Sequence, residues 1–194
     1  MMHGLAKTAV AMLAISLAAC ASKAPRPASP PLPTKVVPAV NRAEAALSAA
    51  SGSLVSGRLV LLPAVHGVRI TGTLGGLSAG GSFGFHLHEN GDCSAVDASS
   101  AGGHFNPGKA PHGRAGKGPH HLGDMDNLMA DASGVVQVDR IIQGATLGGA
   151  ETSNILGRAL IVHAAADDYR SQPAGNAGAR LACGVITTDK APAP

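Results

Sequence analysis

Short apolar runs separated by turn-forming residues recur along most of this 194-residue chain. The runs are rich in Val, Ile, Leu and Thr, and Gly, Asp, Asn and Pro lie between them. No run keeps a helical periodicity over three or four turns. The pattern predicts an all-β domain with strands at residues 54–62, 68–74, 83–88, 135–142, 158–163 and 180–187. Residues 43–50 form a further strand or a helix, because their alanines suit both.

The composition limits the core and the partners of this domain. Hydrophobic residues make up 45% of the chain but aromatic residues only 2%, so the core must consist of Val, Ile, Leu and Ala. The formal charge is +3, with only 14% charged residues and no dense cluster of Lys and Arg. This pattern argues against a nucleic-acid partner and suits a small anionic substrate.

The first nineteen residues have the features of an export signal. Lys7 precedes an apolar stretch, residues 8–19, that is too short to span a bilayer. The stretch ends in the sequence Leu-Ala-Ala before Cys20, which resembles the cleavage box of bacterial lipoproteins. The resemblance implies that residues 1–19 are a signal peptide and that Cys20 is lipidated. The alternative is a plain secretory signal in which Cys20 is incidental.

A proline-rich segment follows the signal. Residues 21–40 contain six of the 13 prolines, which predicts a semi-extended tether over residues 20–41 and a folded domain over residues 42–194.

The chain has three cysteines. If Cys20 carries lipid, Cys93 and Cys183 remain as one possible disulfide in an oxidising compartment.

Histidines are concentrated in and around two long segments without strand character, residues 90–125 and 164–179. Residues i and i+2 of a strand face the same side, so His86 and His88 are expected to point into one site. A later loop, rich in Gly and Pro, supplies a sufficient tetrahedral set for zinc: His104, His112, His121 and Asp124. The alternative is a solvated histidine-rich loop.

A second metal set emerges when His163 is added. Together with His86, His88 and His104 it provides four imidazoles, the set expected for tetragonal copper. His104 is then needed twice. An imidazole has two ring nitrogens, and an imidazolate can bind one metal with each.

Four stretches match one family in order and spacing. They are Gly-Phe-His-Leu-His-Glu at residues 84–89, Gly-His-Phe-Asn-Pro at 103–107, His-Leu-Gly-Asp at 121–124 and Gly-Asn-Ala-Gly-Ala-Arg-Leu-Ala-Cys-Gly-Val at 175–185. Over residues 43–188 the chain resembles copper–zinc superoxide dismutases. Its exported, anchored form resembles the bacterial periplasmic branch, and Ala21 lacks the aspartate associated with inner-membrane retention, so the outer membrane is favoured.

The resemblance implies a fold and an activity. The fold is an eight-stranded antiparallel Greek-key sandwich or flattened barrel with long metal-binding and active-site loops. The activity is dismutation of superoxide to dioxygen and hydrogen peroxide by copper that alternates between Cu(II) and Cu(I), beside a structural zinc bridged through His104. Arg180 attracts superoxide beside copper, and His104, released from reduced copper, supplies a proton.

The resemblance also implies supporting roles. Cys93 and Cys183 form the disulfide, and Asp167 joins His86 to His112, with its neighbour Asp168 as the alternative. The loop at residues 164–179 has fewer basic residues than eukaryotic members, so steering charge is expected from residues elsewhere: Lys109, Arg114 or Lys117. His3, His66 and His120 match no ligand position.

Two matters stay open from the sequence. The family includes monomers and dimers, so a homodimer is one possible assembly. The alternative function is a non-catalytic periplasmic protein that binds or buffers copper and zinc.

Overall fold

The protein's structure is a computed structural model that describes Met1 and residues 36–188. The predicted signal peptide, Cys20 and the tether up to residue 35 lie outside the described residues. The fold belongs to the second of the chain's two compact units, Thr34–Pro194. Within the described residues, no helix is long and apolar enough to cross a membrane.

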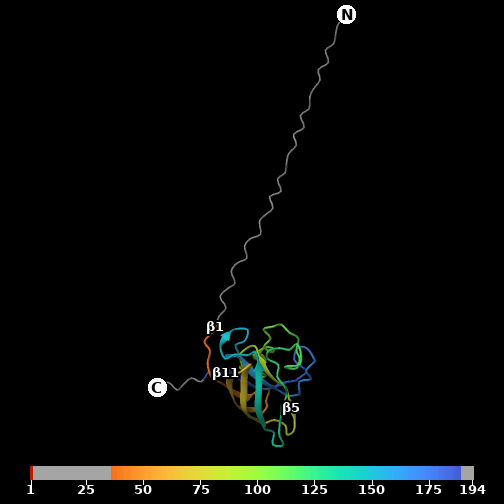
Figure 1. The fold of residues 1–194 in the computed structure, drawn as a ribbon. Coiled ribbons are helices and arrows are strands. Elements are labelled where there is room, and N and C mark those ends of the chain that lie inside the picture. Colours follow the sequence, from red (N-terminus) through yellow and green to blue (C-terminus); the bar gives the residue numbers. More distant parts are fainter. Residues whose placement is uncertain (2–35, 189–194) are drawn as a thin grey trace. The chain divides into compact units, whose positions relative to one another are not determined.

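Antiparallel strands provide nearly all the regular structure (Figure 1). One curled sheet contains seven strands, whose spatial order is β6-β10-β11-β2-β3-β4-β8. In chain order these strands are β2 (Ala43–Ala49), β3 (Ser56–Ala64), β4 (Gly67–Gly75), β6 (Phe85–His88), β8 (Val136–Gln143), β10 (Ala159–His163) and β11 (Arg180–Thr187). Two short ladders pair β1 (Val36–Val37) with β9 (Gly149–Ala150) and β5 (Ser82–Phe83) with β7 (Leu128–Met129).

The predicted strand at residues 83–88 is divided at Gly84. Before this residue β5 pairs with β7, and after it β6 pairs with β10. A Cβ at Gly84 would lie 2.9 Å from the Ala177 Cβ, so the loop before β11 approaches the backbone closely here. Counted as one interrupted strand, β5 and β6 make eight strands together with β7 and the other six strands of the large sheet, and the short pair of β1 and β9 is additional to these eight.

The connections are those of a Greek key. Strand β4 pairs with β8 rather than with the next strand along the chain, and the last strand, β11, pairs with β2. The predicted all-β, antiparallel Greek-key fold is confirmed. Residues 43–49 form a strand, because β2 lies between β11 and β3 and pairs with both.

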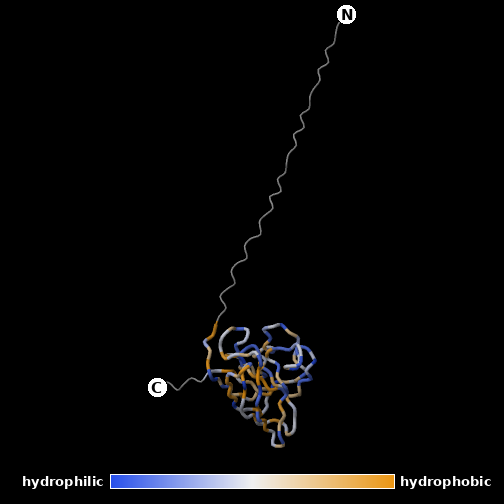
Figure 2. The backbone as a smooth tube through the Cα atoms, viewed as in Figure 1, coloured by the Kyte–Doolittle hydropathy of each residue, from blue (hydrophilic) through white to orange (hydrophobic). Residues whose placement is uncertain are grey.

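Alternation of apolar and polar residues places the core on one face of the sheet. In β2 the buried residues are Ala43, Ala45 and Leu47, and Glu44 lies between them on the other face. Strand β10 is buried along its whole length. Figure 2 shows the hydrophobic segments gathered in the strands and the hydrophilic ones along the loops.

The last residues of the predicted tether belong to the folded unit and pair with another part of it. Val36 and Val37 pair with β9, and the Val40 N–H donates to the Leu147 carbonyl at 2.9 Å. The domain boundary at residue 42 stays a prediction.

The two long segments predicted to be loops contain no strand apart from isolated bridges. Their one regular element is a single 3₁₀ turn, η1 (Ser99–Ala101). They lie side by side next to the sheet (Figure 1). The Gln172 side chain joins them through two hydrogen bonds to the backbone of His112, one of 2.8 Å and one of 2.9 Å.

Candidate metal centre

Two adjacent groups of buried side chains could each hold a metal ion. The first contains His86, His88, His104 and His163; the second contains His104, His112, His121 and Asp124. Within each group the potential ligand atoms lie within 4.8 Å of one another. The predicted residues are therefore brought together, and His104 belongs to both groups.

The first group is formed where β6 lies beside β10. Strand β6 supplies His86 and His88, and β10 ends at His163. The Nδ1–H of His88 donates to the Gly102 carbonyl at 2.9 Å, and the Nδ1–H of His163 donates to the Gly178 carbonyl at 3.3 Å. These bonds turn the two Nε2 atoms toward each other, 3.4 Å apart.

The remaining two nitrogens of this group have no partner in the part of the chain that the structure describes. His86 Nδ1 and His104 Nε2 are buried side-chain atoms that form no hydrogen bond there. Buried polar atoms are rarely left unsatisfied, so each such atom needs an explanation. Four imidazole nitrogens facing one point fit a copper ion.

The second group is centred on Asp124. Its Oδ1 lies 2.8 Å from His104 Nδ1, 3.0 Å from His112 Nδ1 and 3.2 Å from His121 Nδ1. Its Oδ2 accepts backbone N–H bonds from Gly113 at 3.1 Å and from His121 at 2.8 Å. Three imidazoles and one carboxylate fit zinc, which takes such mixed tetrahedral sets.

Asp167 connects the two groups. Its Oδ2 accepts from His86 Nε2 at 2.9 Å and its Oδ1 from His112 Nε2 at 3.0 Å. The neighbouring Asp168 is exposed, and its carboxylate accepts bonds from Ser171 instead. A Cβ at Gly175 would lie 1.8 Å from Asp167 Oδ1, so only glycine leaves room for this carboxylate.

Comparison with known proteins agrees with this geometry. The profile of the copper/zinc superoxide dismutase family matches residues 55–186. The chain belongs to the copper/zinc superoxide dismutase family. Two superoxide dismutases [Cu-Zn] of Aquifex aeolicus, numbered 2 and 1, are 39% and 40% identical to it, over 75% and 67% of this chain and 86% and 79% of theirs. The crystal structure of a SOD-like protein from Bacillus subtilis is also similar, with 38% identity, a TM-score of 0.67, and coverage of 73% of this chain and 96% of that one.

Burial and the two carboxylates determine the charge of the centre in this superoxide dismutase family member. Burial lowers the pKa of His86 to about 4, of His88 to about 2 and of His163 to about 3, which keeps these imidazoles neutral and able to bind metal. Burial also disfavours charge on His112, but its bonds to Asp124 and Asp167 outweigh that effect and raise its pKa to about 9.

The carboxylates stay ionised. Burial alone would raise the pKa of Asp124 and of Asp167, but hydrogen bonds from histidines and backbone N–H groups lower both values below the ordinary range. The centre thus combines the neutral imidazoles of His86, His88 and His163 with two negative charges, a set suited to cations.

Arg180 lies at the start of β11, in register with His163. Its guanidinium donates to the carbonyls of Ala98 at 2.6 Å and Gly102 at 2.7 Å. The Gly102 carbonyl is also the acceptor for His88, so the cation and a candidate copper ligand share one anchor. The disulfide between Cys93 and Cys183, with a Cα–Cα distance of 5.8 Å, ties the loop that carries these carbonyls to the same strand.

Of the basic residues suggested for steering, Arg114 has a local acidic partner. Arg114 is paired with Asp126, at 2.8 Å from Nε to Oδ1, and its guanidinium lies over the Tyr169 ring. This pairing offsets its charge, so Arg114 is poorly suited to attracting a distant anion. The sequence pattern does not predict a role at this centre for Tyr169, Asn127 or Gln172, because neither their type nor their spacing marks them as part of a metal centre.

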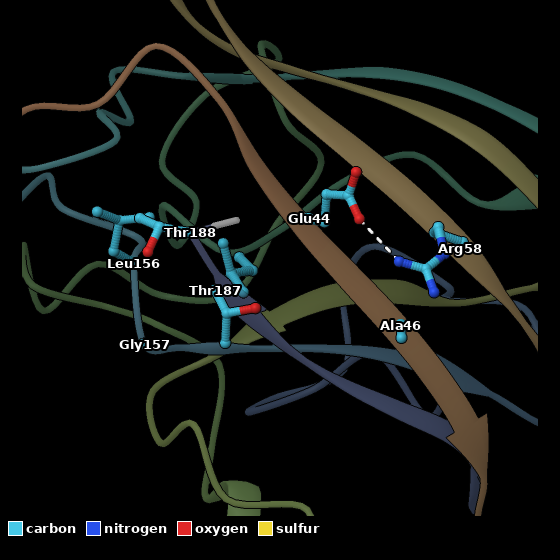
Figure 3. Close-up of a pocket in the computed structure, with 8 residues that line it drawn as sticks. Glu44, Ala46, Arg58, Leu156, Gly157, Thr187 and Thr188 are labelled. Atoms are coloured by element: carbon cyan, nitrogen blue, oxygen red, sulfur yellow. Dashed lines mark hydrogen bonds and ion pairs between the residues drawn. The ribbon is translucent and has the colours of Figure 1, made fainter. Parts of the chain in front are cut away.

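A surface pocket on the outer side of β2, β3 and β11 is separate from this chemistry (Figure 3). Its one carboxylate belongs to Glu44, which is bonded to Arg58 at 2.8 Å. The pocket is lined by Glu44, Ala46, Arg58, Leu156, Gly157, Ile186, Thr187 and Thr188. No histidine or cysteine is among these residues. This pocket offers no set of metal ligands.

Proposed function

We propose that this chain catalyses the dismutation of superoxide to dioxygen and hydrogen peroxide. The observation that carries the proposal is His104, whose two ring nitrogens belong to two adjacent buried sets of metal ligands. One set suits a redox-active metal and the other a structural one. Membership of the copper/zinc superoxide dismutase family supports the same reaction.

The proposed copper ligands are His86, His88, His104 and His163, and the proposed zinc ligands are His104, His112, His121 and Asp124. Bound copper supplies one-electron chemistry, and bound zinc supplies a fixed positive charge. The orphaned nitrogens His86 Nδ1 and His104 Nε2 are the atoms that most need such partners.

The chain's own groups orient the substrate and manage the proton. Arg180, fixed by two carbonyls, presents a cation that attracts and aligns a small anion beside the first group. The Nε2 atom of His104 is the proposed carrier of a proton for the peroxide product. Asp167 fixes which nitrogen of His86 and of His112 faces inward, because it accepts a bond from the opposite nitrogen of each ring.

Substitution of one copper ligand tests this function. In the full chain loaded with copper and zinc, His163→Ala is expected to lower superoxide dismutation by at least about a hundredfold, because it removes one of four imidazoles. His66→Ala, at an exposed histidine outside both groups, is the matched control.

The alternative function makes a different prediction in the same assay. If the loaded chain held both metals tightly yet dismutated superoxide no faster than buffer, it would be a non-catalytic copper- and zinc-binding protein. Equal activity of the His163→Ala and His66→Ala variants would remove copper ligation by His163 from the proposal.

We also propose that the protein is periplasmic and is anchored to a membrane through lipid on Cys20. The outer membrane is favoured over the inner one. The support is the apolar stretch at residues 8–19 directly before this cysteine and the proline-rich segment after it. Cys20→Ser is expected to move the protein from the membrane fraction to the soluble periplasmic fraction. Unchanged fractionation, with no lipid mass on the mature N-terminus, would contradict the anchor.

A further inference from the structure

Tyr169 is held in an unusual backbone conformation two residues after Asp167. Its φ is 60°, in the left-handed region that bulky side chains rarely adopt. A strained residue of this kind persists only where its surroundings determine it, and such residues cluster at functional sites.

Hydrogen bonds hold Tyr169 at both ends. Its backbone N–H donates to Asp167 Oδ1 at 2.6 Å, and its hydroxyl accepts the backbone N–H of Asn127 at 2.9 Å. Asn127 is also paired with the Asp167 backbone: its Oδ1 accepts at 2.8 Å and its Nδ2 donates at 2.9 Å. The Asp167 backbone and the Tyr169 hydroxyl are therefore anchored to the same residue, Asn127.

An arginine covers the tyrosine ring. The Arg114 guanidinium carbon lies 5.0 Å from the ring centroid of Tyr169, within the range of cation–π attraction. Its Nε donates to Asp126 Oδ1 at 2.8 Å. Arg114 follows His112 by two residues, and Asp126 follows Asp124 by two. The side chains of Tyr169, Arg114 and Asp126, called here the tyrosine clamp, therefore join the zinc-ligand loop to the loop at residues 164–179.

The clamp acts on the orientation of one imidazole. Asp167 Oδ1 accepts both from the Tyr169 N–H and from His112 Nε2, so the position of the tyrosine backbone determines where this oxygen lies. The bond to Nε2 leaves His112 Nδ1 directed at Asp124, in the second group of ligands. A shift of the clamp would thus turn a candidate zinc ligand without touching the metal site itself.

We propose that Tyr169, supported by Arg114 and Asp126, is a positioning residue that holds His112 in its zinc-binding orientation through Asp167. The inference rests on the proposed zinc site. This positioning role differs from a purely structural one. An exposed ion pair such as that of Arg114 with Asp126 contributes little to the stability of the fold by itself.

Two variants and one matched control test the clamp. Tyr169→Phe removes the acceptor for the Asn127 N–H, and Arg114→Gln removes both the cation over the ring and the partner of Asp126. Arg69→Gln breaks a comparably exposed arginine–aspartate pair, with Asp139, on β4 and β8. The full chain, loaded with copper and zinc, is mixed with a chromogenic chelator, and the rate of zinc release is measured.

Zinc release is expected to be about tenfold faster in Tyr169→Phe and in Arg114→Gln than in Arg69→Gln, in line with the effect of other partners behind metal ligands. With Co²⁺ in place of zinc, the visible absorption bands are expected to shift in the first two variants only, since they report the ligand geometry. A change in melting temperature alone would not produce this signature.

Equal release rates and unchanged Co²⁺ spectra in all three variants would overturn the clamp, while the unsubstituted protein would still show its zinc site. If the unsubstituted protein itself held no zinc, the proposed function and the clamp would fall together. Whether the unsubstituted chain holds zinc therefore distinguishes failure of the clamp from failure of the proposed function.

Discussion

Single residues in this protein act by deciding which ring nitrogen each histidine turns inward. Backbone carbonyls take the Nδ1–H of His88 and His163, which leaves Nε2 inward. Asp167 takes the Nε2–H of His86, which leaves Nδ1 inward. The orientation of a ligand is thus set by a group that never touches the metal, and such groups affect metal affinity strongly.

The neighbouring aspartates provide a test at this scale. Asp167→Asn replaces one accepting oxygen with an N–H₂ group, which cannot accept from both His86 and His112. We expect zinc affinity to fall by about 10–100-fold, measured by competition with a chelator. Asp168→Asn, at the exposed neighbour that accepts bonds from Ser171, is the control. Equal affinities for the two variants would contradict the role of Asp167.

Among the elements, β11 links the sheet to the centre. It pairs with β10, which carries His163, and with β2, on the opposite side. It also carries Arg180 and Cys183, whose disulfide partner Cys93 lies in the loop that provides the carbonyls for Arg180. One strand therefore aligns a ligand strand, a cation and a covalent crosslink.

Removal of the crosslink is expected to cost stability and order at this element. The disulfide spans 90 residues, and opening a loop of that size corresponds to about 4–5 kcal/mol in the chain-entropy model. The variant with both Cys93→Ser and Cys183→Ser should lose a comparable free energy of unfolding in urea titrations. A loss below about 1 kcal/mol would indicate that the sheet and loops hold this region without the bond.

At the scale of the whole fold, the sheet carries His86, His88 and His163, the loop at residues 90–125 carries the other four candidate ligands, and the loop at residues 164–179 carries Asp167. The buried polar residues of the described chain are almost all in the centre: His86, His88, His104, His112, His121, Asp124, Asn154, His163 and Asp167. Burial of so many titratable groups makes the folding free energy depend on pH.

This dependence is predicted for the protein after its metals are removed by a chelator. Below pH 6.5 the unfolded chain protonates His86, His88 and His163, whereas the fold keeps them neutral because burial lowers their pKa values to about 4, 2 and 3. The unfolded state then binds more protons, so stability falls as pH decreases, by up to about 1.4 kcal/mol per pH unit for each histidine.

His112 acts in the opposite direction. Its pKa is raised to about 9, so its stabilising contribution is complete below pH 6.5 and is lost as pH rises toward 9. Urea titrations at pH 5, 6.5 and 8 should therefore give the highest stability near pH 6.5. A profile that stays flat over this range would contradict the buried, neutral state of the three histidines.

Much of the fold was predictable from local pattern. The strand at residues 180–187 has the predicted bounds, and the others differ by a few residues at their ends, because alternation and turn residues mark strands but not where pairing stops. The break at Gly84 was not predictable, since it depends on a change of partner from β7 to β10.

By itself, the sequence determined which side chains can bind metals and which runs can alternate between core and solvent, because ligand chemistry and strand periodicity are local properties. Only the tertiary structure decided that residues 43–49 form a strand, that Asp167 rather than Asp168 lies between the rings, and that Tyr169 is covered by Arg114. Each of these depends on contacts between segments far apart in the chain, and such contacts exist only once the sheet and the two loops have packed together.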